Sequence, residues 1–435
     1  MLLNGIGFLI LLFSLKDFKR GFMFYLVYQI FWYPGALLFD IGFSIIISMA
    51  LNILFFILYL TRKHKQRHIR MPYTFPILAI IFSLFITCFT AVAGFSSEFS
   101  RMISNICQEY LVIWIAWDII EDKEDFNFLF RMITFVILAA CLYELLEYIL
   151  QTNFLLDYKS TLSKEGIVQY KNTLYEARTR GYRASSFFEH PIGAGMNLGM
   201  YFVIVHTVLI YYKTKLPLKW LAIFTSILCI LGIIFTKMRA GLVFVAIASI
   251  SLIDFKKKWF YELTLLFFIG ILLIFPIIQN NLYILLSLFS ESARVTAGGS
   301  SISMRLSQLE AITQLMMLSP IGGLGEKFGS YISNQYTIAA LSYESIWFEQ
   351  MARHGILGVI ANIILAYYSI IKLPKKYKSK PAFFLSLAYW ITYTLTTIPS
   401  FRTPLYFVLL FYYIKSSNIY QKNRYKKEIY VKVGI

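Results

Sequence analysis

Long apolar runs recur along almost the whole chain, and they constrain the fold more than any other feature. A helix that crosses a bilayer needs about 20 mostly apolar residues, and continuous runs of that kind lack the apolar/polar alternation of a membrane β-barrel. The runs therefore predict thirteen membrane-spanning helices, at residues 2–15, 21–39, 42–61, 71–94, 103–120, 127–150, 192–212, 220–236, 240–253, 260–279, 355–371, 381–400 and 403–414.

The composition excludes the other broad classes of protein. Hydrophobic residues make up 58% of the 435-residue chain, so it is too apolar to be disordered. Charged residues make up only 15%, against roughly 25% in soluble domains, which is too few for the water-facing surface of a soluble enzyme. We expect an all-α, polytopic membrane protein of about 12–13 transmembrane helices, with residues 1–435 forming one integral membrane domain.

The net charge of +18 is explained by topology. Loops on one side of the predicted helices carry 26 Lys and Arg residues, and the alternate loops carry 14. The positive-inside rule makes the richer side cytoplasmic, so the charge does not indicate nucleic-acid binding. The two long loops, 151–191 and 280–354, then face outward, the larger one before the last few helices. We expect a cytoplasmic-membrane protein whose active site faces the periplasm or another extracytoplasmic space.

The end of the first long loop breaks the charge rule. Arg178, Arg180 and Arg183 lie within six residues on the side that should be poor in arginine. His190 and Pro191 follow, and proline fits the first turn of a helix. Guanidinium groups beside a helix N-terminus form an anion site. The alternative is a loop that grips lipid phosphates of the outer leaflet.

A second basic feature is the tight outer turn Thr236-Lys-Met-Arg239-Ala-Gly241. A simple connector would favour neutral turn residues, so Lys237 and Arg239 suggest a second group of cations that converges on the same anion. The alternative is that both side chains extend to the lipid headgroups.

The large outer loop contains the third feature. Its apolar spacing predicts an amphipathic helix at 303–318, followed by a turn at 319–325 that is rich in glycine. Arg305 falls in the first turn of this helix, where the macrodipole disfavours a cation. Arg305 is therefore predicted to serve a ligand.

Acidic residues in basic surroundings are candidates for a general base. Glu344 and Glu349 lie at the end of the large loop, close to His354, and the alternative for each is a salt bridge to an arginine. Glu144 and Glu147 share one face of a predicted span. They fit either a cation or proton site, or a buried contact with a partner such as Arg131 or a tyrosine.

These elements, in this order, resemble the O-antigen polymerase and ligase superfamily of bacterial polysaccharide assembly. The matching stretches cover roughly residues 175–360. They are Arg183-Ala-Ser-Ser-Phe-Phe-Glu-His-Pro191, Thr236-Lys-Met-Arg239-Ala-Gly241, Arg305, Ser319-Pro-Ile-Gly-Gly-Leu-Gly325 and Gly355-Ile-Leu-Gly358.

The resemblance implies about twelve helices with a large outer loop. It also implies a metal-independent, inverting glycosyltransferase, with no cofactor, that acts on glycans carried by undecaprenyl diphosphate. A polymerase moves the growing chain onto the next lipid-linked repeat unit, whereas a ligase moves the finished chain onto lipid A-core. The implied partners are the lipid-linked donor and acceptor, membrane lipid, a chain-length regulator and a flippase.

One departure favours the polymerase. The ligases of this superfamily carry a His-Asn pair where this chain reads Tyr343-Glu344-Ser345. Glu344 thereby becomes the expected general base, with the donor diphosphate held by Arg183 and Arg239 and a donor or acceptor phosphate held by Arg305. The further residues expected to bind substrate are Arg178, Arg180, His190, Lys237, Glu349 and His354.

Three rival functions remain open at this stage. The ligase is the rival of the same class. A flippase or ion-coupled transporter would depend on charges at mid-membrane depth, such as Glu144 and Glu147. A non-catalytic scaffold would leave the outer arginines unexplained.

Overall fold

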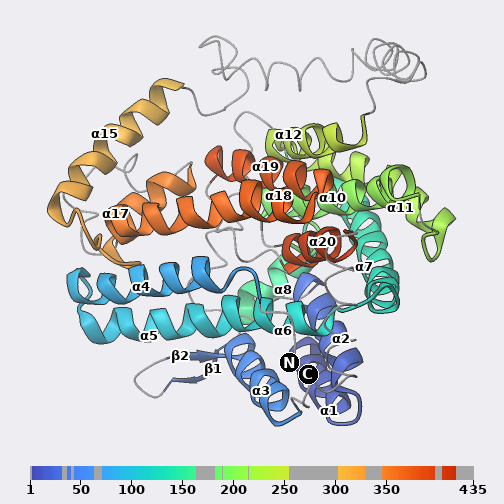
Figure 1. The fold of residues 1–435 in the computed structure, drawn as a ribbon, viewed down its shortest axis with the longest axis horizontal. Helices are drawn as coiled ribbons and strands as arrows, with labels where there is room; N and C mark the ends of the chain where they lie inside the picture. Colours follow the sequence, from blue (N-terminus) through green and yellow to red (C-terminus); the bar gives the residue numbers. More distant parts are fainter. Residues whose placement is uncertain are drawn as a thin grey trace, which may run out of the picture.

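The structure is a computed structural model (Figure 1). It describes residues 2–31, 37–40, 44–62, 71–162, 182–188, 190–213, 215–253, 302–329, 345–396 and 404–417. The predicted span at 260–279 therefore lies outside the described residues.

Helices dominate the described part of the chain, as the apolar runs predict. In order they are α1 (Leu2–Ser14), α2 (Phe18–Phe31), α3 (Ile47–Arg62), α4 (Thr74–Thr90), α5 (Phe95–Asn105), the π-helical turn η1 (Ile106–Tyr110), α6 (Leu111–Ile119), α7 (Lys123–Leu150), α8 (Phe154–Leu162), α10 (Pro191–His206), η2 (Thr207–Tyr211), α11 (Lys219–Phe235), α12 (Arg239–Ser249), η3 (Ile250–Leu252), α15 (Ile302–Leu318), α17 (Ile346–Tyr367), η5 (Tyr368–Lys372), α18 (Leu373–Tyr377), α19 (Lys380–Thr394) and α20 (Pro404–Lys415).

Two details differ from the sequence prediction. Strands β1 (Leu37–Asp40) and β2 (Ser44–Ile46) form a short antiparallel pair where two spans were expected to end and begin. The sequence there contains Pro34, Gly35 and Gly42, which disfavour helix. The predicted loop at 95–102 is helical, because α5 continues through η1 into α6. The last outer element runs straight into the following span as one helix, α17, as the sequence indicates, with a break at Gly355.

Lipid-facing surfaces support a membrane location. Among the described residues, three helical stretches are long and apolar enough to cross a bilayer, at Lys123–Leu150, Pro191–Tyr211 and Ile346–Tyr377, and several shorter apolar helices accompany them. One face of α4 exposes large side chains at the spacing of a helical stripe. They are Phe75, Leu78, Phe82, Phe85 and Phe89. Such a face would be unstable in water, so the protein is an all-α polytopic membrane protein.

Helix α20 is the centre of the core. Every residue from Leu405 to Tyr413 is buried, so the helix is covered on all sides. Its rings stack on neighbouring helices: the centroids of Tyr406 and Tyr389 are 3.7 Å apart, and those of Tyr412 and Phe126 are 3.6 Å apart. At its C-terminal end, the Lys415 ammonium donates to the carbonyls that end α6.

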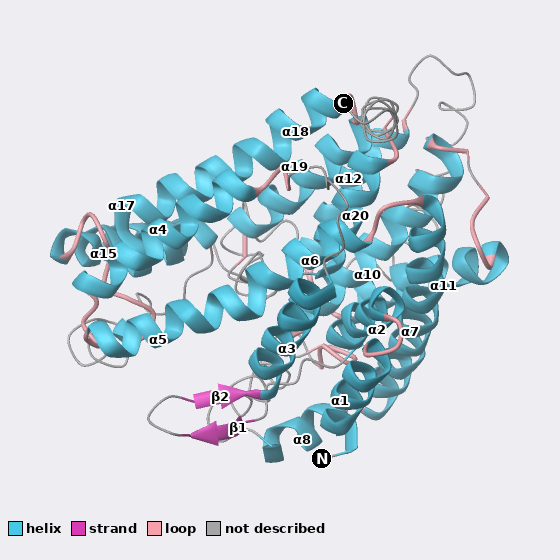
Figure 2. Ribbon diagram, turned by 60° about the horizontal axis from the view of Figure 1, so that its bottom comes forward, coloured by secondary structure: helices cyan, strands magenta, loops and turns pink. Residues whose placement is uncertain are grey.

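The helices fall into two groups that lie at opposite ends of the molecule (Figures 1 and 2). Helices α4, α5, α15 and the first part of α17 lie at one end, where α17 packs on α4 and α15. Helices α7, α10, α11 and α12 lie at the other, where α10 packs on α11 and α12. Helix α19 contacts α12 and α17, and so connects the two groups.

Candidate functional site

Arg183 is buried against the turn between α11 and α12. Only 4% of this residue is exposed, and its Nη2 contacts the sulfur of Met238. The next residue, Ala184, donates its backbone N–H to the carbonyl of Phe235 at 3.2 Å. The two basic segments therefore lie side by side at Arg183 and the Lys237–Met238 turn.

The turn brings a second cation close to Arg183. Lys237 has a left-handed φ of 52°, and Thr236 stabilises the turn by accepting from the N–H of Met238 at 3.2 Å. Burial lowers the pKa of Lys237, and the nearby charge of Arg183 lowers it further. Two like charges held together in this way favour a bound anion.

A buried carboxylate holds the segment that carries Arg183. Glu147 of α7 accepts from the hydroxyl of Tyr182 at 2.8 Å, from the N–H of Ser185 at 3.0 Å and from the N–H of Ser186 at 2.6 Å. Ser186 needs this support because its φ of 55° is unfavourable for a residue with a side chain. A tyrosine is thus the partner of Glu147, one of the alternatives that the sequence left open.

His190 caps α10 beside this group. Its Nδ1 accepts from the N–H of Ile192 at 3.1 Å, and Pro191 occupies the first turn as predicted. Burial, and then the charge of Arg183, lower the pKa of His190 to about 4, so the ring is neutral at physiological pH.

A glycine contact fixes the distance between α10 and α12. The backbone oxygen of Gly195 lies 3.0 Å from the place where a Cβ on Gly241 would be. Any larger residue at Gly241 would push the helices apart, and the Gly195-x-x-x-Gly199 spacing is a sequence signature of such a close approach. Arg239 is the first residue of α12, and its backbone therefore lies at this tightly packed helix end.

Arg305 contacts the C-terminal end of α19. Its Nη2 donates to the carbonyl of Leu395, directly after α19, at 3.1 Å. Helices α12 and α19 pack together, and Lys380 at the start of α19 bonds to the carbonyl of Ile253, just beyond α12, at 3.2 Å. The two helices are therefore antiparallel, so the end of α19 that Arg305 contacts lies level with the start of α12, at Arg239.

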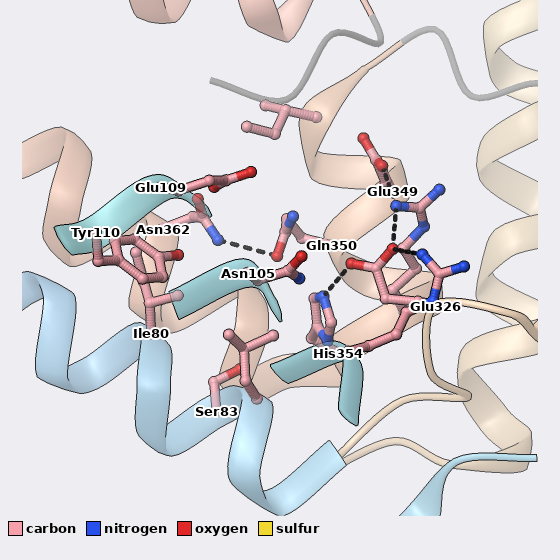
Figure 3. A pocket seen from close by; sticks show the side chains of 14 residues that line it. Ile80, Ser83, Asn105, Glu109, Tyr110, Glu326, Glu349, Gln350, His354 and Asn362 are labelled. Atoms are coloured by element: carbon pink, nitrogen blue, oxygen red, sulfur yellow. Dashed lines mark hydrogen bonds and ion pairs between the residues drawn. The ribbon is translucent and has the colours of Figure 1, made fainter. Parts of the chain in front are cut away.

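Glu349 and His354 belong to a different group of charged residues, around a cavity between α4, η1 and α17 (Figure 3). Arg353 is its centre. The Nη1 of Arg353 lies 2.6 Å from Glu349 Oε1 and 3.0 Å from Glu326 Oε2, and Arg101 lies 3.9 Å from Glu326 Oε2. For Glu349, the salt-bridge alternative from the sequence is confirmed.

His354 is buried deep in this group. Its Nδ1 lies 3.2 Å from the Thr87 hydroxyl, and its Nε2 lies 3.8 Å from Glu326 Oε1. The residue is 4% exposed. Its surroundings make it a structural residue at the junction of α4, α17 and the loop after α15.

That loop owes its shape to backbone contacts with α17. The N–H groups of Leu324 and Gly325 donate to the carbonyls of Ala352 and Arg353 at 3.0 and 2.9 Å. Gly355 of α17 lies opposite this loop and has a φ of 60°. A Cβ there would lie 2.7 Å from two backbone oxygens of the loop. Only glycine fits, which explains the break in α17.

Glu326 is held at the end of the same loop. Its N–H donates to Glu98 Oε1 of α5 at 3.0 Å. Burial raises the pKa of Glu98, so this carboxyl holds a proton more readily than an exposed one. The loop, α5 and α17 thus meet at Glu326.

The predicted site residues therefore form two groups instead of one. Arg183, Lys237 and His190 lie together with the start of α12, and Glu349 lies with His354 around the cavity. Arg178, Arg180 and Glu344 lie outside the described residues. Sequence reasoning missed Glu326, Arg353 and Arg101. The sequence signal for Arg353 was its position four residues after Glu349, one helical turn away.

The described residues include no group of three His, Cys, Asp or Glu side chains that could hold a metal ion.

A comparison with known families agrees with the sequence motifs. Residues 224–363 match the model of a family described as O-antigen ligase. The match covers 140 of the 435 residues and overlaps the motifs between Thr236 and Gly358. The matched range includes Lys237, Arg239, Arg305, Glu349 and His354, whereas Arg183 precedes it. A search of curated proteins found no match.

Proposed function

We propose that the protein is a polysaccharide repeat-unit polymerase. It transfers a glycan chain from undecaprenyl diphosphate onto the next lipid-linked repeat unit, in the assembly of O-antigen, capsule or exopolysaccharide. The observation that carries the proposal is the buried contact of Arg183 with the Lys237–Met238 turn. Cations held together in this way would bind the leaving diphosphate.

The chemistry requires those cations. The acceptor hydroxyl oxygen attacks the anomeric carbon of the donor sugar, and the bond from that carbon to the diphosphate oxygen breaks. Undecaprenyl diphosphate leaves with its electron pair and its negative charge. Guanidinium groups stabilise that charge through paired N–H donors. A single displacement inverts the anomeric configuration and needs no metal ion.

We assign the roles as follows. Arg183 and Arg239 hold the donor diphosphate, with Lys237, Arg178, Arg180 and the neutral ring of His190 beside it. Arg305 holds donor or acceptor phosphate from the end of α19. Glu344 takes the proton of the acceptor hydroxyl, directly before Ser345, which caps α17.

The comparison with ligases supports the choice of polymerase. A ligase of this superfamily uses a histidine before the last helix of the large loop. In this chain His354 is the nearest histidine, and it is buried between Thr87 and Glu326. Both of its ring nitrogens face partners at the junction of α4 and α17, and the sequence position of the ligase histidine is taken by Glu344.

The transporter alternative would use charges at mid-membrane depth. Both oxygens of Glu147 accept hydrogen bonds from the segment that carries Arg183. This use of Glu147 favours a fixed support over a cation path.

We also propose the topology in which the chain works. Residues 1–435 form one membrane domain, and the loops 151–191 and 280–354 face the extracytoplasmic side. Membrane lipid, a flippase that delivers the repeat unit and a chain-length regulator are the proposed partners.

The direct test is extension of lipid-linked repeat units by the purified protein, without nucleotide sugar. A ladder of longer glycans supports the polymerase. Transfer to lipid A-core with no ladder would instead identify a ligase. In cells, loss of a polymerase leaves core bearing one repeat unit, whereas loss of a ligase leaves core without O-glycan.

A further inference from the structure

We propose that the cavity between α4, η1 and α17 binds uncharged sugar, through its hydroxyl groups, and does not bind the diphosphate. In the proposed reaction this sugar is the acceptor, so the inference deepens the proposed function and rests on it. The cavity is open at its mouth and has a volume of about 90 Å³.

The charges of the cavity do not suit a diphosphate. Its lining contains three glutamates, Glu109, Glu326 and Glu349, and two arginines, Arg101 and Arg353. With His354 neutral, the formal charge of the lining is −1. Both arginines already lie within 4 Å of a carboxylate, so a diphosphate would have to displace those contacts.

Amide side chains supply the contacts that a sugar needs. Asn362 Nδ2 donates to Gln350 Oε1 at 3.0 Å, and this leaves the amide nitrogen of Gln350 without a hydrogen-bond partner among the described residues. Figure 3 shows this nitrogen turned away from Asn362, and Asn105 beside it. The Asn105 side chain likewise makes no hydrogen bond to the described residues. Hydroxyl groups both donate and accept, so they match amides without adding charge.

The polar lining extends toward membrane depth. Ser83 lies about two turns from the end of α4 at Thr90, and Asn362 lies about two turns beyond the break at Gly355. Polar groups at such positions are unfavourable unless they have a function. The apolar part of the lining, with Ile80 and Tyr110, can contact the C–H face of a sugar ring.

The cavity also lies near Arg305, one of the proposed phosphate ligands. Ile346 lines it, and the indole N–H of the next residue, Trp347, donates to Thr394 at 2.9 Å. Thr394 precedes Leu395, whose carbonyl Arg305 contacts. A sugar in the cavity would therefore lie on one side of the first turn of α17, with Arg305 on the other.

Two probes distinguish sugar binding from phosphate binding in the purified full-length protein. One is the phosphate-free repeat-unit oligosaccharide released from the host's own polysaccharide, and the other is inorganic pyrophosphate. The variants are Asn105→Leu and Gln350→Met in the cavity and Arg183→Ala in the phosphate site. Asn197→Leu is the matched control, because among the described residues this half-buried asparagine bonds only to a carbonyl of its own helix, 2.8 Å away.

We expect each cavity variant to weaken oligosaccharide binding about tenfold, the equivalent of one net hydrogen bond, and to leave pyrophosphate binding unchanged. Arg183→Ala should do the reverse, and Asn197→Leu should change neither. Asn105→Leu removes no hydrogen bond within the described structure, so its thermal unfolding should match the wild type and its binding result should be free of folding effects.

The proposal is overturned if the wild type binds no oligosaccharide, if both cavity variants bind it normally, or if they lose pyrophosphate instead. Failure of the proposed function gives a different result. In that case the cavity variants would lose sugar binding as expected, while the purified wild type would extend no lipid-linked glycan.

Discussion

The two charged groups of this protein use the same residue types in opposite ways. Glu326 and Glu349 each form an ion pair with Arg353, so their charges are largely compensated. Around Arg183, the nearby carboxylate of Glu147 accepts from backbone N–H groups and a tyrosine. The Arg183 and Lys237 charges therefore repel each other, as the lowered pKa of Lys237 indicates.

Under the proposed function, this difference fits the two groups to different parts of one substrate. A site in which two cations repel each other binds an anion strongly, because the anion relieves the repulsion. A site whose charges are paired and whose amides are open binds neutral polar groups. A lipid-linked glycan has both kinds of group, a diphosphate and a sugar.

The largest expected effect comes from Arg183. Arg183→Ala should reduce transfer in the purified system by about 100-fold or more, because a preorganised donor to the leaving diphosphate is lost. Arg183→Lys should recover little, since an ammonium lacks the paired N–H geometry of a guanidinium. Rates of chain extension at saturating acceptor measure both effects.

Arg131→Ala is a suitable control for this experiment. Arg131 is an exposed arginine of α7 that belongs to neither charged group, so its loss should leave the rate unchanged. If Arg183→Ala and Arg239→Ala both kept the wild-type rate and polymer length, the diphosphate assignment would be wrong.

The apolar runs and the arginines that break the charge rule predicted much of this first group. Arg183, Lys237 and the close approach of α10 and α12 could be inferred because each has a local signature in the sequence. The support from Glu147 could not be inferred, because its partners lie 35–39 residues away. Only the folded chain brings a carboxylate of α7 to the N–H groups after Arg183.

The cavity could not be predicted for a similar reason. Glu326 meets Glu98 across 228 residues, and His354 meets Thr87 across 267. Predicting one site from Glu349, His354 and the outer arginines assumed that all outer polar residues converge. The packing of α17 on α4 instead encloses Glu349 and His354 in a separate group.

The next prediction compares two glutamates on one face of α7. Glu147→Gln replaces an acceptor by an amide nitrogen, which leaves a buried N–H of Ser185 or Ser186 unsatisfied. Such a loss costs about 1–3 kcal/mol. The segment Tyr182–Ser186, which carries Arg183, should shift. As a result, kcat for extension should fall roughly tenfold, with a smaller change in the KM of the acceptor.

Glu144→Gln is the matched control. Glu144 is fully buried one turn earlier, and neither of its oxygens has a hydrogen-bond partner among the described residues. Gln should therefore be accepted with near-normal kcat. Equal loss of activity in the two variants would show that α7 is generally sensitive, and that Glu147 has no special role in placing Arg183.

A third prediction concerns stability instead of rate. Arg353→Met leaves Glu349 and Glu326 without their shared cation. Breaking a fully buried pair costs roughly 3–5 kcal/mol, and we expect about 2 kcal/mol here because the Arg353 side chain is 26% exposed. Thermal unfolding in detergent should show the loss, and Arg353→Met/Glu349→Gln should recover part of it.

Pyrophosphate binding by the same variant sharpens the comparison of the two groups. If Arg353 only balances the glutamates of the cavity, pyrophosphate should bind to Arg353→Met as it does to the wild type. A large loss of pyrophosphate binding at unchanged thermal stability would instead make Arg353 a phosphate ligand.

The smallest expected effect is the pH response of His190. Its pKa in the folded protein is lowered to about 4, from an ordinary value of 6.5, by burial and by the charge of Arg183. Between those two values the unfolded chain binds the proton more readily than the folded protein. The stability that the neutral ring contributes is thus complete above pH 6.5 and decreases as the pH falls toward 4. His190→Asn keeps a helix-capping side chain but cannot titrate, so its unfolding temperature should fall less steeply over this range. The same slope in both proteins would mean that His190 is not held neutral beside Arg183, and that the positive charge of that group extends less far than the structure indicates.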